Sequence, residues 1–325
     1  MILVIGGSGF VGSRLIDLIG KNNCLNIDKS ESYFYNDITT IGNITNEDQI
    51  TIDKRVKVVV LLAAEHADNV SPKSLYYNVN VAGTINVLKK METMNIKNLV
   101  FTSSVAVYGL NKDNPDENHP VDPFNDYGKS KFMAEKEIFK WYKRDTTRNV
   151  SIIRPTVIFG ERNRGNVYNL INQIASGNFA MVGNGNNKKS MAYVGNICEF
   201  IYFLVEKNNS GYNIYNYSDK PDYTMNSLVN LIEKKMGISI MKFKIPYHVG
   251  MMMGYFIDLI SNLFKLNFKI SSVRVKKFCA TTQYNSSLAH KIFNPSVSLK
   301  EGLNKTLNFE FIETKNDDDV LFYSE

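Results

Sequence analysis

The fold is decided by the stretch Ile2-Leu3-Val4-Ile5-Gly6-Gly7-Ser8-Gly9-Phe10-Val11-Gly12, in which a buried-type strand runs into a glycine-rich turn and then a helical pattern. Glycines at positions 6, 9 and 12 allow a tight turn and a close backbone approach, so the helix N-terminal amides can face a pyrophosphate. A glycine-rich turn without a ligand is the alternative, but the strand–loop–helix context favours a dinucleotide site. Cofactor contacts are therefore expected at Gly6, Gly9, Phe10, Val11 and Gly12.

An acidic residue follows the second predicted strand, Cys24 to Ile27. Asp28 lies about 20 residues after the glycines, where a carboxylate accepts hydrogen bonds from ribose hydroxyls and would repel a 2′-phosphate. The sequence therefore predicts NAD and not NADP, although the adjacent Lys29 weakens this preference. Asp37 and Ile38 are expected to face the adenine, with a surface turn as the alternative.

Residues 57–64, KVVVLLAA, form a continuous apolar run typical of a parallel strand covered on both faces. The carboxyl end of such a strand opens onto the ligand crevice. Asn80, at the start of the next helical pattern, is expected to bond main chain near the nicotinamide ribose or to cap the helix. Further cofactor contacts are expected at Leu62, Ala63, Ala64 and His66, with a structural histidine as the alternative for the last.

Three polar side chains form the candidate catalytic set. Tyr127 and Lys131 lie four residues apart at the start of a helical pattern, so they share one helix face. A lysine cation beside a tyrosine favours the phenolate, which can take a proton from a sugar hydroxyl while hydride leaves the same carbon. Because Y-x-x-x-K is common by chance, a third group is needed. Ser104, at the carboxyl end of the predicted strand 98–102, supplies a hydroxyl.

Composition bounds the remaining possibilities. A chain of 325 residues can bury one large or two modest cores, and its three cysteines have no paired spacing. We therefore expect a reducing, cytoplasmic setting, no disulfide framework and no metal site. No apolar run reaches the roughly 20 residues of a membrane span. The net charge of +6 permits an anionic ligand or membrane surface without requiring nucleic acid.

The predicted fold class is α/β: a Rossmann-type doubly wound parallel sheet with a smaller, interleaved α/β substrate domain. The NAD-binding domain is expected over residues 1–165 with a return segment at 190–215, and the substrate domain over 166–189 and 216–325. Arg162 and Arg164, beyond the last predicted strand, are expected to meet an anionic substrate. Solvated loop charge is an equally good interpretation of both.

Residues 246–266, PYHVGMMMGYFIDLISNLFKL, carry an apolar helical stripe wider than a normal core face. Lys and Arg outnumber acidic residues around it. A methionine-rich apolar helix with basic flanks could rest on an anionic membrane or grip a lipid chain. The alternative, a helix packed inside the smaller domain, is favoured by the sequence pattern alone.

These motifs occur in a familiar order. GGSGFVG, Asp28, LLAA, NVAGT, SSVAVYG, YGKSK and RPTVIFG resemble those of the extended short-chain dehydrogenase/reductase family, in its branch of NAD-dependent sugar epimerases and dehydratases. The resemblance implies a catalytic triad of Ser104, Tyr127 and Lys131. It implies cofactor contacts at Asn80, Tyr127, Lys131 and Pro155. Substrate contacts are expected at Ser103, Ser104, Asn166, Lys188 and Arg274, the last against a diphosphate.

The reaction class follows from one difference between this chain and the dehydratases of the family. Dehydratases of this branch carry Asp-Glu after the active-site hydroxyl, whereas this chain has Val105-Ala106, which cannot transfer protons. Epimerisation is therefore expected, and net reduction of a 4-keto sugar by the same residues stays open.

A narrower resemblance concerns the substrate. SPKSLYYNVNV, VAVYGLNKDNPDENHP, RPTVIFGERNRGNVYN, NKKSMAYVGN and SSVRVKKFCATTQ resemble a group of bacterial 4-epimerases that act on N-acetylglucosamine carried by undecaprenyl diphosphate, for O-antigen synthesis. This implies a lipid-linked diphospho-sugar substrate and a peripheral location on the cytoplasmic face of the inner membrane. Alternatives are a soluble UDP-N-acetylglucosamine 4-epimerase in the cytoplasm and a non-catalytic NAD-binding scaffold. A homodimer is left open.

Overall fold

A seven-stranded parallel sheet forms the larger part of the protein. In the computed structural model the described residues are 1–67, 70–240, 243–264, 271–314 and 320–323. From edge to edge the strands are β10 (Gly211–Tyr217), β6 (Asn149–Pro155), β5 (Asn98–Thr102), β4 (Val58–Leu61), β1 (Ile2–Ile5), β2 (Cys24–Asp28) and β3 (Thr39–Ile41). All neighbours in this sheet run parallel.

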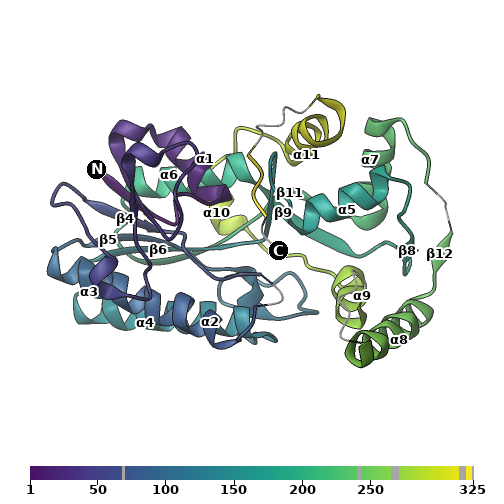
Figure 1. The fold of residues 1–325 in the computed structure, drawn as a ribbon, viewed down its shortest axis with the longest axis horizontal. Coiled ribbons are helices and arrows are strands. Elements are labelled where there is room, and N and C mark those ends of the chain that lie inside the picture. Colours follow the sequence, from purple (N-terminus) through teal and green to yellow (C-terminus); the bar gives the residue numbers. More distant parts are fainter. Residues whose placement is uncertain (68–69, 241–242, 265–270, 315–319, 324–325) are drawn as a thin grey trace.

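Helices cover both faces of this sheet (Figure 1). One face carries α1 (Phe10–Ile19) and α6 (Val194–Lys207); the other carries α2 (Ser74–Tyr77), α3 (Thr84–Thr93) and α4 (Asp126–Arg144). Successive residues of β1 point to opposite faces, so Val4 packs in the core beneath α1 and α6 whereas Leu3 packs in the core beneath α3 and α4. The apolar runs of the central strands are thus buried on both sides, and the predicted fold class is confirmed.

The strand order fixes where a ligand can bind. The chain proceeds outward from β1 to β2 and β3, then crosses back to β4 on the other side of β1. The connections after β1 and β4 therefore diverge at the carboxyl edge of the sheet. In open α/β sheets such a switch point is where nucleotides bind.

A smaller part lies beyond the end of β6. Its strands are β7 (Val157–Phe159), β9 (Lys188–Tyr193) and β11 (Asp219–Thr224) in one sheet, and β8 (Met181–Val182) with β12 (Lys244–Ile245) in another. Its helices are α5 (Asn166–Ala175), α7 (Met225–Met236), α8 (Tyr247–Phe264), α9 (Ser272–Cys279) and α11 (Leu299–Leu307). Between β9 and β11 the chain returns to the large sheet through α6 and β10. The domain boundaries given above stay a prediction.

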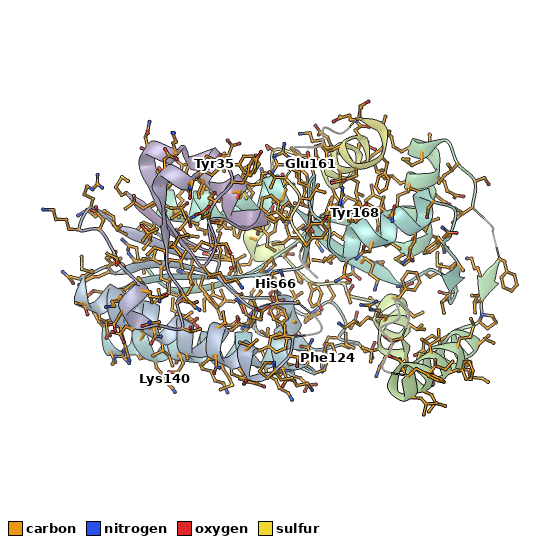
Figure 2. All side chains as sticks on the ribbon, viewed as in Figure 1. Tyr35, His66, Phe124, Lys140, Glu161 and Tyr168 are labelled. Atoms are coloured by element: carbon orange, nitrogen blue, oxygen red, sulfur yellow. The ribbon has the colours of Figure 1, made fainter. Side chains whose placement is uncertain are left out.

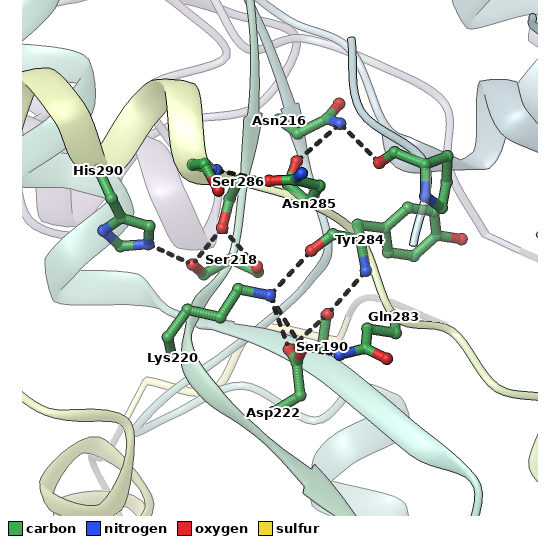
Figure 3. A network of polar contacts seen from close by, with 12 residues as sticks. Ser190, Asn216, Ser218, Lys220, Asp222, Gln283, Tyr284, Asn285, Ser286 and His290 are labelled. Carbon is green, nitrogen blue, oxygen red and sulfur yellow. Dashed lines mark hydrogen bonds and ion pairs between the residues drawn. The ribbon is translucent and has the colours of Figure 1, made fainter. Parts of the chain in front are cut away.

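Polar contacts tie the returning chain to the smaller part (Figure 3). Lys220 and Gln283 both bond Asp222, and Lys220 also donates to the Tyr284 carbonyl. Asn216, on β10, donates to the carbonyls of Pro115 and Asn285 at 3.2 and 3.1 Å. Through Pro115, the network therefore also holds the long loop 109–125 that precedes α4. The short helix α10 (Ser287–Ile292) follows Asn285 in the chain, and its His290 forms a hydrogen bond with the Ser218 carbonyl.

Helix α8 packs through its small and polar side. A Cβ at Gly250 would lie 2.5 Å from Val182, and one at Gly254 would lie 2.7 Å from the Ser272 backbone. One turn further, Asp258 accepts from the Ser272 hydroxyl at 2.5 Å. The opposite side is exposed and apolar, so the structure contradicts the alternative of a core helix. Its exposed side chains include Val249, Met252, Met253, Tyr255, Phe256, Leu259, Leu263 and Phe264. Residues 265–266 of the predicted stretch lie outside the described residues. No helix in the described ranges is long and apolar enough to cross a membrane.

Candidate active site

The glycine turn between β1 and α1 is shaped by close backbone packing. Gly6 has φ +94°, and a Cβ there would lie 2.5 Å from the Ala63 amide nitrogen. A Cβ on Gly12 would lie 2.4 Å from the Gly6 carbonyl oxygen. A Cβ on Gly9, in contrast, would meet only that oxygen, at 3.6 Å. Gly6 and Gly12 thus serve the turn itself, whereas Gly9 keeps open the space at the start of α1.

That space suits an anion. Helix α1 begins at Phe10, and Gly9 caps it without a side-chain hydrogen bond to the first-turn amides. Free amides at a helix N-terminus attract phosphate through hydrogen bonding and the helix dipole. The open cradle at Gly9 therefore fits the pyrophosphate of NAD.

Two side chains of β2 hold the turn. The buried Asn26 accepts from the Gly7 amide at 2.8 Å and donates to the Ser8 hydroxyl at 3.1 Å. Asp28 accepts from the Ser8 and Ser30 amides, each at 3.0 Å. Sequence reasoning found Asp28 and missed Asn26, although a polar residue inside an apolar strand was a usable signal. Asp28 thus lies beside the pyrophosphate cradle, where a ribose would follow.

Asp37 does not reach this edge, which corrects the predicted adenine contact. It belongs to the 3-10 turn Asn36–Ile38 before β3 and forms an exposed ion pair with Lys21, which precedes β2. Thr39, the first residue of β3, pairs with Asn26, so Asp37 lies toward the amino end of the strands. Ile38 packs against the core under α1. Residues 42–44 follow β3 instead, and the Gly42 amide bonds the Asp28 carbonyl at 2.8 Å.

Asp28 and Asp37 can be compared by the same substitution, because only Asp28 lies beside the glycine turn. Asp28→Asn removes the charge that holds the ribose diol and repels a 2′-phosphate, so NAD affinity should fall at least about tenfold while NADP affinity rises. Asp37→Asn removes an exposed charge remote from the turn and should leave both affinities unchanged. Calorimetric titration with each nucleotide measures this. A loss of NAD affinity in Asp37→Asn but not in Asp28→Asn would reverse the assignment.

The chain after β4 is braced by Asn80. Leu62 and Ala63 both donate to the Ile5 carbonyl, which places this segment directly against the glycine turn. The buried Asn80 side chain bonds the backbone of Glu65 with both its oxygen and its nitrogen, at 2.8 and 2.9 Å. It also donates to the Ser130 hydroxyl at 2.9 Å. Asn80 therefore connects the segment after the carboxyl end of β4 to residues 127–131 of α4. Ala64 and the exposed His66 lie in this same segment.

Ser104 and Tyr127 stand on elements in close contact. Asn125 caps α4 by accepting from the Gly128 amide at 2.9 Å. A Cβ on Gly128 would lie 2.5 Å from the Ala106 carbonyl, so α4 begins directly against the 3-10 turn Val105–Tyr108. Ser104 caps that turn by accepting from the Ala106 amide at 3.1 Å, which leaves its hydroxyl proton to donate. Tyr127 is half-buried, with its ring 6.4 Å from that of Tyr76.

Lys131 is buried one helix turn beyond Tyr127. Its Nζ lies 4.4 Å from the centre of the Phe101 ring, and only 2% of the residue is exposed. Among the described residues it has no hydrogen-bond acceptor or ion-pair partner. Burial lowers the pKa of Lys131 to about 7, and the nearby Glu135 charge opposes that shift. A buried amine without an acceptor fits a site that a ribose hydroxyl completes. Close by, Pro155 ends β6, and the next side chain, Thr156, has a buried hydroxyl with no partner in the described chain.

The predicted substrate residues are only partly brought together. Ser103 is buried and donates to Glu135, so its hydroxyl is not presented to a sugar. Arg164 forms a buried ion pair with Glu310 and stacks over Tyr168, which corrects its predicted role with an anionic substrate. The Arg162 amide donates to the same Glu310, and its guanidinium lies over Phe34 and Phe309. Asn166, Lys188 and Arg274 are exposed, on α5, β9 and α9.

Helix α9 lies beside the catalytic segment. The Lys277 Nζ is 5.9 Å from the ring of Phe124, which directly precedes the cap of α4. Figure 2 shows Phe124 toward the α8–α9 pair, whereas Lys140, on helix α4, lies at the periphery. The basic helix α9, against which α8 packs, therefore lies beside the start of α4.

A Rossmann sheet with a glycine turn, an acid on β2 and a Ser/Tyr/Lys set defines a dinucleotide-dependent enzyme of the short-chain dehydrogenase/reductase class. The model of the NAD dependent epimerase/dehydratase family matches residues 2–217, so this chain belongs to that family, and the predicted family and cofactor are confirmed.

Relatives span the whole chain. An Escherichia coli O157:H7 protein named N-acetyl-alpha-D-glucosaminyl-diphospho-ditrans,octacis-undecaprenol 4-epimerase is 54% identical over 330 residues, covering 100% of this chain and 99% of its own. UDP-glucose 4-epimerase of Vibrio cholerae is 28% identical over 247 residues, covering 70% of this chain and 73% of its own. The crystal structure of UDP-glucuronic acid 4-epimerase from Bacillus cereus with NAD shares the fold with a TM-score of 0.72 at 19% identity, covering 95% of this chain and 97% of that one.

Proposed function

We propose that this chain interconverts N-acetylglucosamine and N-acetylgalactosamine carried on undecaprenyl diphosphate by epimerising carbon 4, for O-antigen or another surface polysaccharide. The observation that carries the proposal is the full-length 54% identity to the Escherichia coli protein named for that activity. It is supported by Ser104, which follows the carboxyl end of β5, and by Tyr127 and Lys131 at the start of α4.

The site residues would divide the reaction as follows. NAD, when bound, supplies a reversible hydride acceptor. The Tyr127 phenolate takes the proton of the sugar 4-hydroxyl, and the Ser104 hydroxyl donates a hydrogen bond to that oxygen. The Lys131 cation stabilises the phenolate. The 4-keto sugar then turns over, and Tyr127 returns the proton after hydride reaches the other face. Val105 and Ala106 carry no acid or base, so no water is eliminated.

A membrane-facing role for α8 supports the lipid carrier. An amphipathic helix normally buries its apolar stripe, but α8 buries Gly250 and Gly254, packs the half-buried Asp258 against Ser272 and exposes its apolar stripe. A large exposed apolar patch marks an interaction surface. The exposed Arg274 and Lys276 on the adjoining α9 would favour anionic headgroups and a diphosphate. The enzyme would thus lie on the cytoplasmic face of the membrane with its site at the surface.

Two pairs of identical substitutions test this surface. Leu259→Gln/Leu263→Gln should weaken binding to anionic phospholipid vesicles at least about tenfold, because both leucines are exposed on α8. Leu18→Gln/Leu288→Gln removes exposed leucines from α1 and α10 and should bind like the unsubstituted protein. Vesicle flotation measures the binding. Equal binding of all three proteins would rule out α8 as the membrane surface.

The same surface could instead join two copies of the chain. Sedimentation velocity without lipid distinguishes the two occupants: a dimer that the α8 pair dissociates, with no vesicle binding, would replace the membrane by a homodimer interface.

Substrate choice is tested directly. Purified protein is given undecaprenyl-linked N-acetylglucosamine or UDP-N-acetylglucosamine, without added cofactor, and the released sugar is identified. We expect N-acetylgalactosamine from the lipid-linked sugar. Efficient turnover of the UDP-sugar alone would favour a soluble UDP-N-acetylglucosamine 4-epimerase. No turnover of either 4-hydroxy sugar, together with reduction of a supplied 4-keto sugar only when NADH is added, would indicate net reduction.

A further inference from the structure

A buried ion pair lies under the catalytic helix. Glu135 on α4 and Arg154 on β6 are each 3% exposed. The Arg154 Nε and Nη2 donate to the two Glu135 oxygens at 2.9 and 2.6 Å, and the Ser103 hydroxyl donates at 2.5 Å. Burying such a pair costs desolvation energy that its Coulomb attraction often fails to exceed. Stability alone is therefore a weak reason for its presence.

Its position relative to Lys131 suggests another reason. Glu135 follows Lys131 by four residues, so the two side chains share one face of α4. Among the described residues, Lys131 otherwise contacts Phe101 and lacks an acceptor of its own. Burial disfavours an ammonium, and Glu135 supplies the negative charge that opposes this effect.

We propose that Glu135 is a positioning residue whose carboxylate keeps Lys131 protonated one helix turn from Tyr127, while Arg154 and Ser103 hold that carboxylate in place. The role assigned to Tyr127 rests on the proposed function. The effect on Lys131 does not, because it is measured without substrate.

Two tyrosines and one further carboxylate lie near the Glu135–Arg154 ion pair. The Arg154 Nη1 donates to the Tyr108 hydroxyl at 2.7 Å, and that hydroxyl donates to Asn216 at 2.9 Å. On β10, the Tyr212 hydroxyl donates to the Glu135 backbone carbonyl. Burial raises the pKa of both Tyr108 and Tyr212, so both stay neutral at working pH. Glu117 lies beyond Arg154, where it accepts from the Asn216 amide, and burial raises its pKa.

Lysine NMR provides the test. Protein labelled with carbon-13 at lysine Cε is titrated with NAD bound, and the Lys131 signal is assigned by its loss in Lys131→Arg. In Glu135→Gln the Lys131 midpoint should fall by about one pH unit or more, whereas Glu135→Asp should stay close to the original. Lys189 serves as an internal control: burial lowers its pKa to about 8, and it bonds only the Lys277 and Ala280 carbonyls in the described chain. Its midpoint should not move.

Two further measurements separate this role from a structural one. Glu135→Gln/Arg154→Met removes both buried charges, so it keeps the test usable if the single variant misfolds. Its Lys131 midpoint should still fall, because Glu135 is the charge that acts on Lys131, but by less than about one pH unit, because the Arg154 cation that disfavours the ammonium is removed as well. In the pH profile of turnover, the alkaline limb should move to lower pH with little change in KM. An unchanged Lys131 midpoint in a folded variant overturns the proposal. If the Lys131 midpoint moves in Glu135→Gln but the unsubstituted protein has no epimerase activity, the role of Glu135 is upheld and the proposed function is rejected.

Discussion

Tyr127→Phe should lower epimerase turnover by at least about a thousandfold while NAD binding and stability stay close to those of the unsubstituted protein. The substitution removes one oxygen, and with it the proposed acceptor of the sugar proton. The ring is half-buried and lies against Tyr76, so the phenyl group should keep its place. Turnover is measured on the lipid-linked sugar, NAD by titration, and folding by thermal unfolding.

Tyr142→Phe is the matched control for that experiment. Tyr142 is on the same helix, four turns beyond Tyr127, and packs against Tyr212 near the far end of α4. Losing its hydroxyl should change turnover less than about twofold. If Tyr127→Phe remains active, another group must accept the proton, and the triad assignment is wrong. If it loses NAD as well, Tyr127 holds the cofactor more than it transfers protons.

The sequence predicted best where local chemistry and topology coincide. Gly6, Gly12 and Asp28 could be found because the turn between a strand and a helix constrains each of them locally. The parallel sheet covered by helices follows from the same alternation of apolar strands and helices. Lys131 could be found because four-residue spacing on a helix needs no knowledge of the rest of the fold.

Partners distant in sequence were harder to predict. Arg164 was expected to meet an anionic substrate, but it forms a buried ion pair with Glu310, which lies far along the chain. Asp37 was chosen because it is an acid near β3, although the register of that strand, which only the sheet reveals, turns it toward Lys21. No local pattern singles out Glu135, because its pairing with Arg154 depends on the contact between α4 and β6.

Helix α8 shows how a correct pattern can leave its environment undecided. Its apolar stripe was readable, but a stripe has the same sequence signature whether it faces a core or a lipid. Gly250 and Gly254 decide the matter, because the close approach of Val182 and Ser272 on their side turns the stripe outward.

The turn glycines give the second large prediction. Gly9→Val should lower NAD affinity by about a thousandfold, because its side chain would fill the cradle and cost two or more charge-assisted hydrogen bonds to the pyrophosphate. Its effect on unfolding should stay within about 1 kcal/mol, since Gly9 has extended backbone angles and its Cβ would meet only one atom within 4 Å, at 3.6 Å. NAD titration and thermal unfolding of the apo protein measure the two effects separately.

Gly12→Ala should behave in the opposite way to Gly9→Val in the apo protein. Its Cβ would lie 2.4 Å from the Gly6 carbonyl oxygen and 2.5 Å from the Gly7 Cα, and both are backbone atoms that cannot rotate away. The turn must open, at a cost of about 1–3 kcal/mol of folding free energy, and NAD affinity falls with the turn. A Gly12→Ala protein as stable as the original would show that this close backbone contact does not hold the turn. A Gly9→Val protein that still binds NAD would show that the pyrophosphate does not lie at the start of α1. The cofactor would then have to reach Lys131 by another route, because Gly9 marks the open end of that helix and Asp28 lies beside it.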